Sequence, residues 1–100
     1  MAAYQQALAV SPGYGWAWNG RGLALAALGR YEEALDSYIK ATEVAPRDVW
    51  FWHNRGETLM QLGRWEEAVR AFNRALEIDP QHQPSRDKRT EARKKLGEEE

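Results

Sequence analysis

Two titratable residues stand at a spacing that could support metal binding or acid–base chemistry. His53 and Glu57 are four positions apart, so on a helix their side chains would lie on one face and could share a metal ion. Two ligands do not make a metal site, and the second histidine, His82, falls in a predicted turn at an unknown distance. The spacing therefore favours a hydrogen-bonded surface pair, and we predict no metal site.

No residue stands out as a catalytic nucleophile. The chain has no cysteine, which excludes thiol nucleophiles and Cys-ligated zinc or iron–sulfur sites. Its glycines between residues 13 and 22 follow no predicted strand and lack the spacing of a phosphate-binding loop. No histidine is placed by its spacing as a base for the three serines considered, Ser11, Ser37 and Ser85. We predict that the protein is not an enzyme, has no catalytic residue and needs no cofactor.

The segment Arg86–Lys95 could instead contact an anionic partner. Six basic residues in it stand against two acidic ones, a local charge of +4. Such a helix could touch RNA or an anionic membrane surface. However, the segment has no aromatic residue to stack on a base and no wide apolar face, and Glu98–Glu100 follow it. A solvated terminal helix is the favoured interpretation, and RNA contact is the weaker alternative.

Composition places these residues in one small folded domain. The chain has 100 residues, of which 43% are hydrophobic, and a net charge of −1. This composition is not that of a disordered chain, and the balanced charge does not favour nucleic-acid binding by the whole chain. No apolar run reaches the ~18 residues of a membrane span, and residues 1–10 lack the features of a signal peptide. We expect a cytoplasmic protein without a membrane partner.

The elements that position these residues repeat with a period of 34. Residues 15–48 and 49–82 are identical at 14 of 34 positions, whereas chance would give about two. In each copy, apolar residues recur at helical spacing in two stripes. The first stripe ends at a glycine, Gly29 or Gly63, and the second ends before a proline, Pro46 or Pro80. The pattern predicts two helices per copy.

The repeat resembles the tetratricopeptide repeat, whose period is also 34. The matching residues are Trp18, Gly22, Leu25, Ala34, Tyr38, Ala41 and Pro46 in the first copy, and Trp52, Gly56, Leu59, Ala68, Phe72, Ala75 and Pro80 in the second. Arg21 and Arg55 depart from the family's pattern, which has a leucine before the first glycine. The resemblance implies an all-α protein, a right-handed α-solenoid of antiparallel helix pairs with about six helices.

Four segments follow from this resemblance. Residues 1–14 are expected to be the second helix of a truncated repeat and its turn, and residues 15–48 and 49–82 two full repeats. Residues 83–100 are expected to be a polar capping helix with an acidic tail, because the last repeat would otherwise expose an apolar face. The unpaired first helix indicates either self-association or excision from a longer array.

The resemblance also implies a concave groove lined by the first helix of each pair. The groove positions are Trp16, Asn19, Leu23, Ala26, Ala27, Trp50, His53, Asn54, Glu57, Met60 and Gln61. Aromatic anchors with a polar rim are typical of protein-binding surfaces. We therefore predict a protein–protein interaction scaffold that binds a peptide or helix. Trp16 and Trp50 are expected to lie side by side on neighbouring helices. Their role could be ligand binding, self-association or plain packing against flanking side chains. Trp18 and Trp52 are expected in the core.

Two further interpretations concern the partner. One subfamily of this fold clamps the C-terminal carboxylate of chaperone tails with Lys and Asn residues, and Asn54 and Lys88 stand at two such positions. Asn19, Leu23 and Pro84 stand where the other three clamp residues are needed, which argues against that ligand. The second interpretation is a self-assembling scaffold, most simply a two-fold dimer, or an engineered scaffold without a natural groove ligand.

Overall fold

The computed structural model describes residues 14–97, and these residues form five helices and no strand. The helices are α2 (Gly15–Ala27), α3 (Tyr31–Val44), α4 (Val49–Gln61), α5 (Trp65–Ile78) and α6 (Gln83–Lys95). The all-α solenoid fold predicted from the repeat is confirmed, with a helix number close to the six expected. The predicted first helix, within residues 1–14, and the acidic residues 98–100 lie outside the described residues, Tyr14 excepted.

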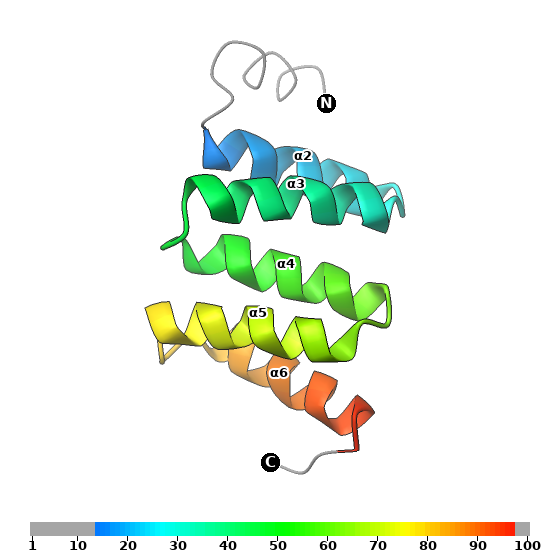
Figure 1. Ribbon diagram of the computed structural model, residues 1–100, viewed down its shortest axis with the longest axis vertical. Helices are drawn as coiled ribbons and strands as arrows, with labels where there is room; N and C mark the ends of the chain where they lie inside the picture. The colour runs from blue at the N-terminus through cyan, green and yellow to red at the C-terminus, as the bar shows by residue number, and fades with distance from the viewer. Residues whose placement is uncertain (1–13, 98–100) are drawn as a thin grey trace.

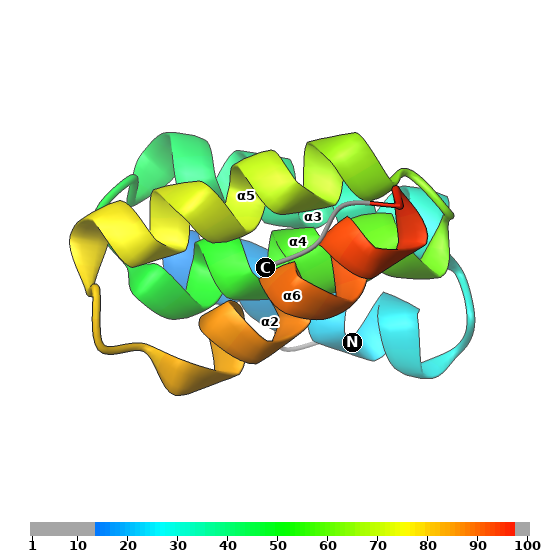
Figure 2. The same ribbon diagram turned by 90° about the horizontal axis from the view of Figure 1, so that it is seen from below.

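The helices follow one another along the long axis of the molecule (Figure 1), and each contacts the next. A view along that axis shows α3 and α5 on one side and α2, α4 and α6 on the other (Figure 2). Among helices of residues 14–97 that are not adjacent in sequence, α4 and α6 make the most extensive contact, and it is much smaller than the contacts between sequential helices. The first helices of successive pairs therefore share one face of the solenoid, as the repeat requires.

The helix ends follow the predicted stop signals. Gly29 and Gly63 adopt φ angles of 78° and 73°, the left-handed conformation that glycine adopts without strain. In both turns the residue after the glycine returns a hydrogen bond to the helix, from Arg30 N to Leu25 O and from Arg64 N to Leu59 O, each 2.9 Å. The two glycines therefore end the first helix of each pair and allow the chain to reverse.

Each helix pair packs a glycine against an aromatic ring. A Cβ atom added at Gly22 would lie 2.5 Å from Tyr38 Cε1, and one added at Gly56 would lie 2.6 Å from Phe72 Cε1. The sequence predicted a close approach here near Ala34 and Ala68. Both alanines are fully buried, but the group that needs the space is the ring one turn further along. The cost of a mid-helix glycine is thus offset by burial of a large aromatic side chain.

We expect Gly56→Ala to lower the free energy of unfolding by about 1–3 kcal/mol, although alanine is the better helix former. The added methyl group collides with the ring of Phe72, which is fully buried and cannot turn away without disturbing the core. Urea unfolding followed by circular dichroism measures the change. In a Phe72→Leu background the same substitution should cost less, and an equal cost in both backgrounds would contradict the steric explanation.

Candidate binding groove

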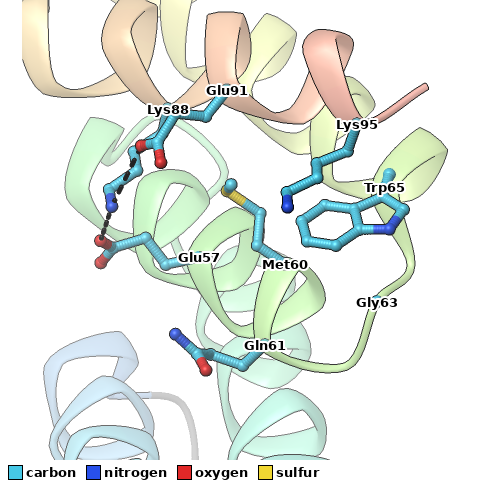
Figure 3. A pocket seen from close by; sticks show the side chains of 8 residues that line it. All are labelled: Glu57, Met60, Gln61, Gly63, Trp65, Lys88, Glu91 and Lys95. Carbon is cyan, nitrogen blue, oxygen red and sulfur yellow. Dashed lines mark ion pairs between the residues drawn. The ribbon is translucent and has the colours of Figure 1, made fainter. Parts of the chain in front are cut away.

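Two hollows lie along the face formed by α2, α4 and α6. The first, of about 290 Å³, lies between α2 and α4 and is lined by Leu23, Ala26, Ala27, Tyr31, Tyr38, Asn54, Glu57, Thr58 and Gln61. The second, of about 390 Å³, lies between α4, the start of α5 and α6 (Figure 3), and is lined by Glu57, Met60, Gln61, Gly63, Trp65, Lys88, Glu91 and Lys95. Glu57 and Gln61 line both, so the hollows adjoin across α4. We call these two hollows together the groove.

Large apolar side chains are exposed at the N-terminal ends of α2 and α4. Trp16 is 58% exposed and Trp50 is 51% exposed, while Leu23 projects into the first hollow and is also half exposed. This exposure leaves both tryptophans accessible to a partner. Each also packs on a flanking side chain, which is the plain-packing interpretation left open from the sequence: the ring of Trp16 stacks on Tyr14 with centroids 5.8 Å apart, and Trp50 contacts His53. Among residues 14–97 no ring contact joins Trp16 to Trp50, so the two rings, which were expected side by side, do not stack on each other.

The polar residues predicted for the groove bond mainly to one another. Asn54 Nδ2 donates to Asn19 Oδ1 at 3.0 Å and thereby connects α4 to α2. Glu57 Oε1 lies 3.5 Å from His53 Nε2, so the two side chains pair as their spacing predicts, but His53 is buried and they do not form the surface pair that we expected. The hydrogen bond from His53 lowers the pKa of Glu57, so this carboxylate is ionised in the groove. These side chains therefore form a fixed polar floor between the two hollows.

His53 itself is not on the groove surface. Its residue is 4% exposed, and its Nδ1 lies 3.0 Å from Ser85 Oγ on α6. His82 Nδ1 approaches the same hydroxyl at 2.7 Å. The prediction that no histidine lies near Ser85 is therefore wrong, because chain spacing did not account for the packing of the first turn of α6 against α4. Trp50 covers both imidazole rings, with centroids 5.4 Å from His53 and 4.5 Å from His82.

This serine–histidine arrangement is not open to a substrate in the observed conformation. Ser85 is fully buried, and its hydroxyl lies within hydrogen-bonding distance of two imidazoles. A nucleophile must reach the substrate atom that it attacks, and this hydroxyl is fully buried. Across residues 14–97, no three His, Asp or Glu side chains are grouped so as to hold a metal ion.

Charge in the second hollow is largely paired (Figure 3). Lys88 Nζ lies 3.9 Å from Glu57 Oε2 and 3.4 Å from Glu91 Oε2, so its ammonium group sits between two carboxylates. Lys95 Nζ lies 5.7 Å from the centroid of the Trp65 ring. Met60 contributes the apolar surface between these groups and packs on the core cluster of α4 and α5. This hollow is mixed in character, with an apolar floor and compensated charges.

Sequence reasoning missed one wall of the groove. Trp65 begins α5 and forms a wall of the second hollow, whereas only first helices were expected to line the groove. Trp18 and Trp52, which were expected in the core, are partly buried, and Trp52 packs against the core cluster. Trp52 lies at the edge of the core with the guanidinium groups of Arg55 and Arg74 on its ring, 4.9 and 5.3 Å from the centroid.

Comparison with known proteins places this architecture among repeat proteins. Three sequence models described as tetratricopeptide repeat or TPR repeat match residues 3–36, 22–63 and 49–82. The last match has the same bounds as the second repeat identified from the 34-residue period. A search of curated proteins found no match. In residues 14–97, no helix combines the length and apolar character that a membrane span requires.

Several solved structures share the fold at low sequence identity. The Arabidopsis OM64 TPR domain is 24% identical, with a TM-score of 0.86 over 91% of this chain and 75% of that one. The first TPR of Spaghetti (RPAP3), bound to the HSP90 peptide SRMEEVD, is 19% identical, with a TM-score of 0.90 over 94% and 75%. The crystal structure of MamA is 18% identical, with a TM-score of 0.91 over 97% and 57%.

Proposed function

Since the chain belongs to the tetratricopeptide repeat family, we propose that it is a protein-interaction scaffold whose groove binds a peptide or helix of a partner protein without catalysing a reaction. The observation that carries this proposal is the pair of adjoining hollows over α2, α4 and α6, on helices whose first turns expose Trp16 and Trp50. Half-exposed tryptophans are costly to leave in water and are the commonest energetic anchors of protein interfaces.

The groove residues indicate the chemistry of the ligand. Leu23 and the two exposed tryptophans offer apolar contact area near α2, so we infer a ligand with a large aliphatic or aromatic side chain at that end. At the α6 end, Met60 and Trp65 offer apolar contacts beside compensated charges. A ligand of mixed polarity, such as one face of an amphipathic helix, matches this surface.

An acidic chaperone tail is a poorer match, although one structural neighbour is bound to an HSP90 peptide. Lys88 is at one of the two clamp positions that this chain retains, and its ammonium group is already held by Glu57 and Glu91. Asn54, at the other position, donates to Asn19. A carboxylate ligand would have to displace these partners and would meet the negative charge of Glu57 and Glu91.

The test is to select a ligand and locate it. The full chain is used to select peptides from a displayed random library, and the best peptide is added to the ¹⁵N-labelled chain. We expect amide shifts concentrated on α2, α4 and α6, with few on the exposed face of α3 and α5. Selection that repeatedly fails, or shifts confined to α3 and α5, would overturn the proposal.

A second candidate function is self-association, because the exposed residues Trp16, Leu23 and Trp50 would satisfy a second copy as well as a partner. The unpaired first helix that also motivated this alternative lies outside the described residues. Light scattering over a concentration series measures the solution mass. A monomer at high micromolar concentration excludes self-association through these residues, and a dimer that Trp16→Ala disrupts supports it.

RNA contact through α6 is the weaker alternative. Lys88 is paired with two carboxylates, Arg89 donates to Asn73 Oδ1 at 2.9 Å, and Lys95 lies over Trp65. Several of the basic residues of α6 are thus engaged within the protein. If RNA binds, its affinity should fall steeply with salt concentration, because neutralised phosphates release counterions, whereas binding of an apolar peptide should not.

A further inference from the structure

The two buried imidazoles and the hydroxyl between them form a directed chain of hydrogen bonds. A hydroxyl has one hydrogen, so Ser85 donates to only one of the two Nδ1 atoms and accepts from the other. Glu57 faces His53 Nε2, and an ionised carboxylate accepts only, so neutral His53 carries its hydrogen on Nε2. Its Nδ1 therefore accepts from Ser85 Oγ, and His82 Nδ1 donates to the same oxygen. Donors and acceptors thus run in order from His82 through Ser85 and His53 to Glu57.

One atom at the end of this chain has no partner. His82 Nε2 is buried without a hydrogen-bonding neighbour, and in the neutral arrangement it carries only a lone pair. His82 is the N-cap residue of α6 and is 7% exposed, with the ring of Trp50 against it. Trp50 is therefore one of the groups packed on this imidazole, at a ring-centroid distance of 4.5 Å.

The cluster has no place for an additional proton. A proton added at His82 Nε2 finds no acceptor. A proton added at His53 Nδ1 would face the hydroxyl hydrogen of Ser85. The hydroxyl would then have to turn toward His82 Nδ1, but that nitrogen already carries a hydrogen. With either position of the added proton, one buried polar hydrogen has no acceptor, which is energetically costly. Rotation of His82 into solvent would remove this cost.

We propose that the His53–Ser85–His82 cluster is a pH-sensitive switch that holds Trp50 against the first turn of α4 when both imidazoles are neutral and releases it when the cluster takes up a proton. The charged groups that act on the cluster come from three places: Glu57 on α4, Asp79 at the end of α5 and Lys88 on α6. Phe72 is the α5 ring against His53 and carries no charge. Within residues 14–97, the carboxylate in close contact with an imidazole is that of Glu57, whose Oε1 lies 3.5 Å from His53 Nε2.

The direction of the pH dependence follows from His82. Burial, together with His53, lowers the pKa of this imidazole below its ordinary value, while Asp79 raises it to a smaller extent. Between the two pKa values the unfolded chain binds the proton and the folded chain does not. The contribution of His82 to stability is therefore present above the unfolded pKa of about 6.5 and is lost as the pH falls through and below it.

The consequence for ligand binding rests on the proposed function, but the movement of Trp50 does not. The test therefore uses the full chain without ligand, and the indole N–H signal of Trp50, assigned with Trp50→Phe, is followed from about pH 8 to about pH 5. We expect this signal to shift with the same midpoint as the imidazole C–H signals of the cluster. The switch can fail while the groove still binds a peptide, and the groove can fail to bind while the switch operates.

The matched variant is His82→Asn, which keeps a residue type favoured at an N-cap and a side-chain amide that can donate to or accept from Ser85. The new side chain cannot titrate, so the Trp50 signal should lose the transition that follows the His82 imidazole, whereas His53 remains in contact with the indole. An unchanged pH dependence in this variant would overturn the switch. If the variant does not fold, the titration of the wild-type chain tests the switch. The switch is overturned if the Trp50 signal is constant, or if its midpoint differs from that of the imidazole signals.

Discussion

Phe72→Ala is expected to lower the free energy of unfolding by about 3–5 kcal/mol, a large part of the 5–15 kcal/mol that stabilises a typical domain. Phe72 is fully buried at the centre of the main core cluster, between Leu59 on α4 and Ala92 on α6. It also fills the space opened by Gly56 and contacts the ring of His53. Its removal leaves a cavity beneath three helices, so the neighbouring side chains cannot collapse into the site without moving a helix. Urea unfolding followed by circular dichroism measures the loss.

Trp16→Ala is the control for this prediction. The tryptophan is a larger side chain than phenylalanine, but it is 58% exposed and its ring contact is with Tyr14. Its removal from the surface should change the unfolding free energy by less than about 1 kcal/mol. If the two variants lost similar stability, the distinction drawn here between core and groove aromatics would be wrong.

The repeat could be predicted from the sequence because its determinants are local and occur twice. The helix ends depend on Gly29 and Gly63 and on the prolines that close each repeat, and both copies show the same signals. The packing of Gly56 on Phe72 involves residues 16 apart within one helix pair. Such contacts are set by neighbouring elements, so a 34-residue period is sufficient to indicate them.

The buried histidine cluster could not be predicted in the same way, because it joins the second pair to a third helix of different composition. A signal was nevertheless present in the period. Ser85 stands 34 residues after Phe51, which itself stands 34 after Ala17, and all three are buried. Extending the repeat into α6 would have placed Ser85 inside the protein. His82 likewise stands 34 residues after Asp48, the residue that caps α4 through its carboxylate.

Trp50→Ala is expected to weaken binding of a groove-selected peptide at least about 30-fold, the loss of roughly 2 kcal/mol or more that marks an interface anchor. Trp50 lies in the first turn of α4, the helix shared by both hollows, and half of its surface faces solvent. The other half rests on His53 and His82, which hold the indole in one orientation before any ligand arrives. A ligand that covers this ring gains apolar contact without the entropic cost of ordering it. Fluorescence polarisation of the labelled peptide measures the affinity, and circular dichroism checks that the helical content is unchanged.

Trp52→Phe separates loss of an anchor from loss of a tryptophan in general. Trp52 is two residues from Trp50 on the same helix, but it lies outside the groove, between the guanidinium groups of Arg55 and Arg74. Phenylalanine retains its packing against the core while removing the Nε1 donor to Pro46 O, so we expect a small loss of stability and an unchanged affinity. If Trp50→Ala unfolds the chain, Trp50 belongs to the core. If Trp50→Ala and Trp52→Phe weaken peptide binding equally, the ligand is not held by the groove face. The loss of affinity would then reflect a general loss of order in α4 rather than the absence of one contact.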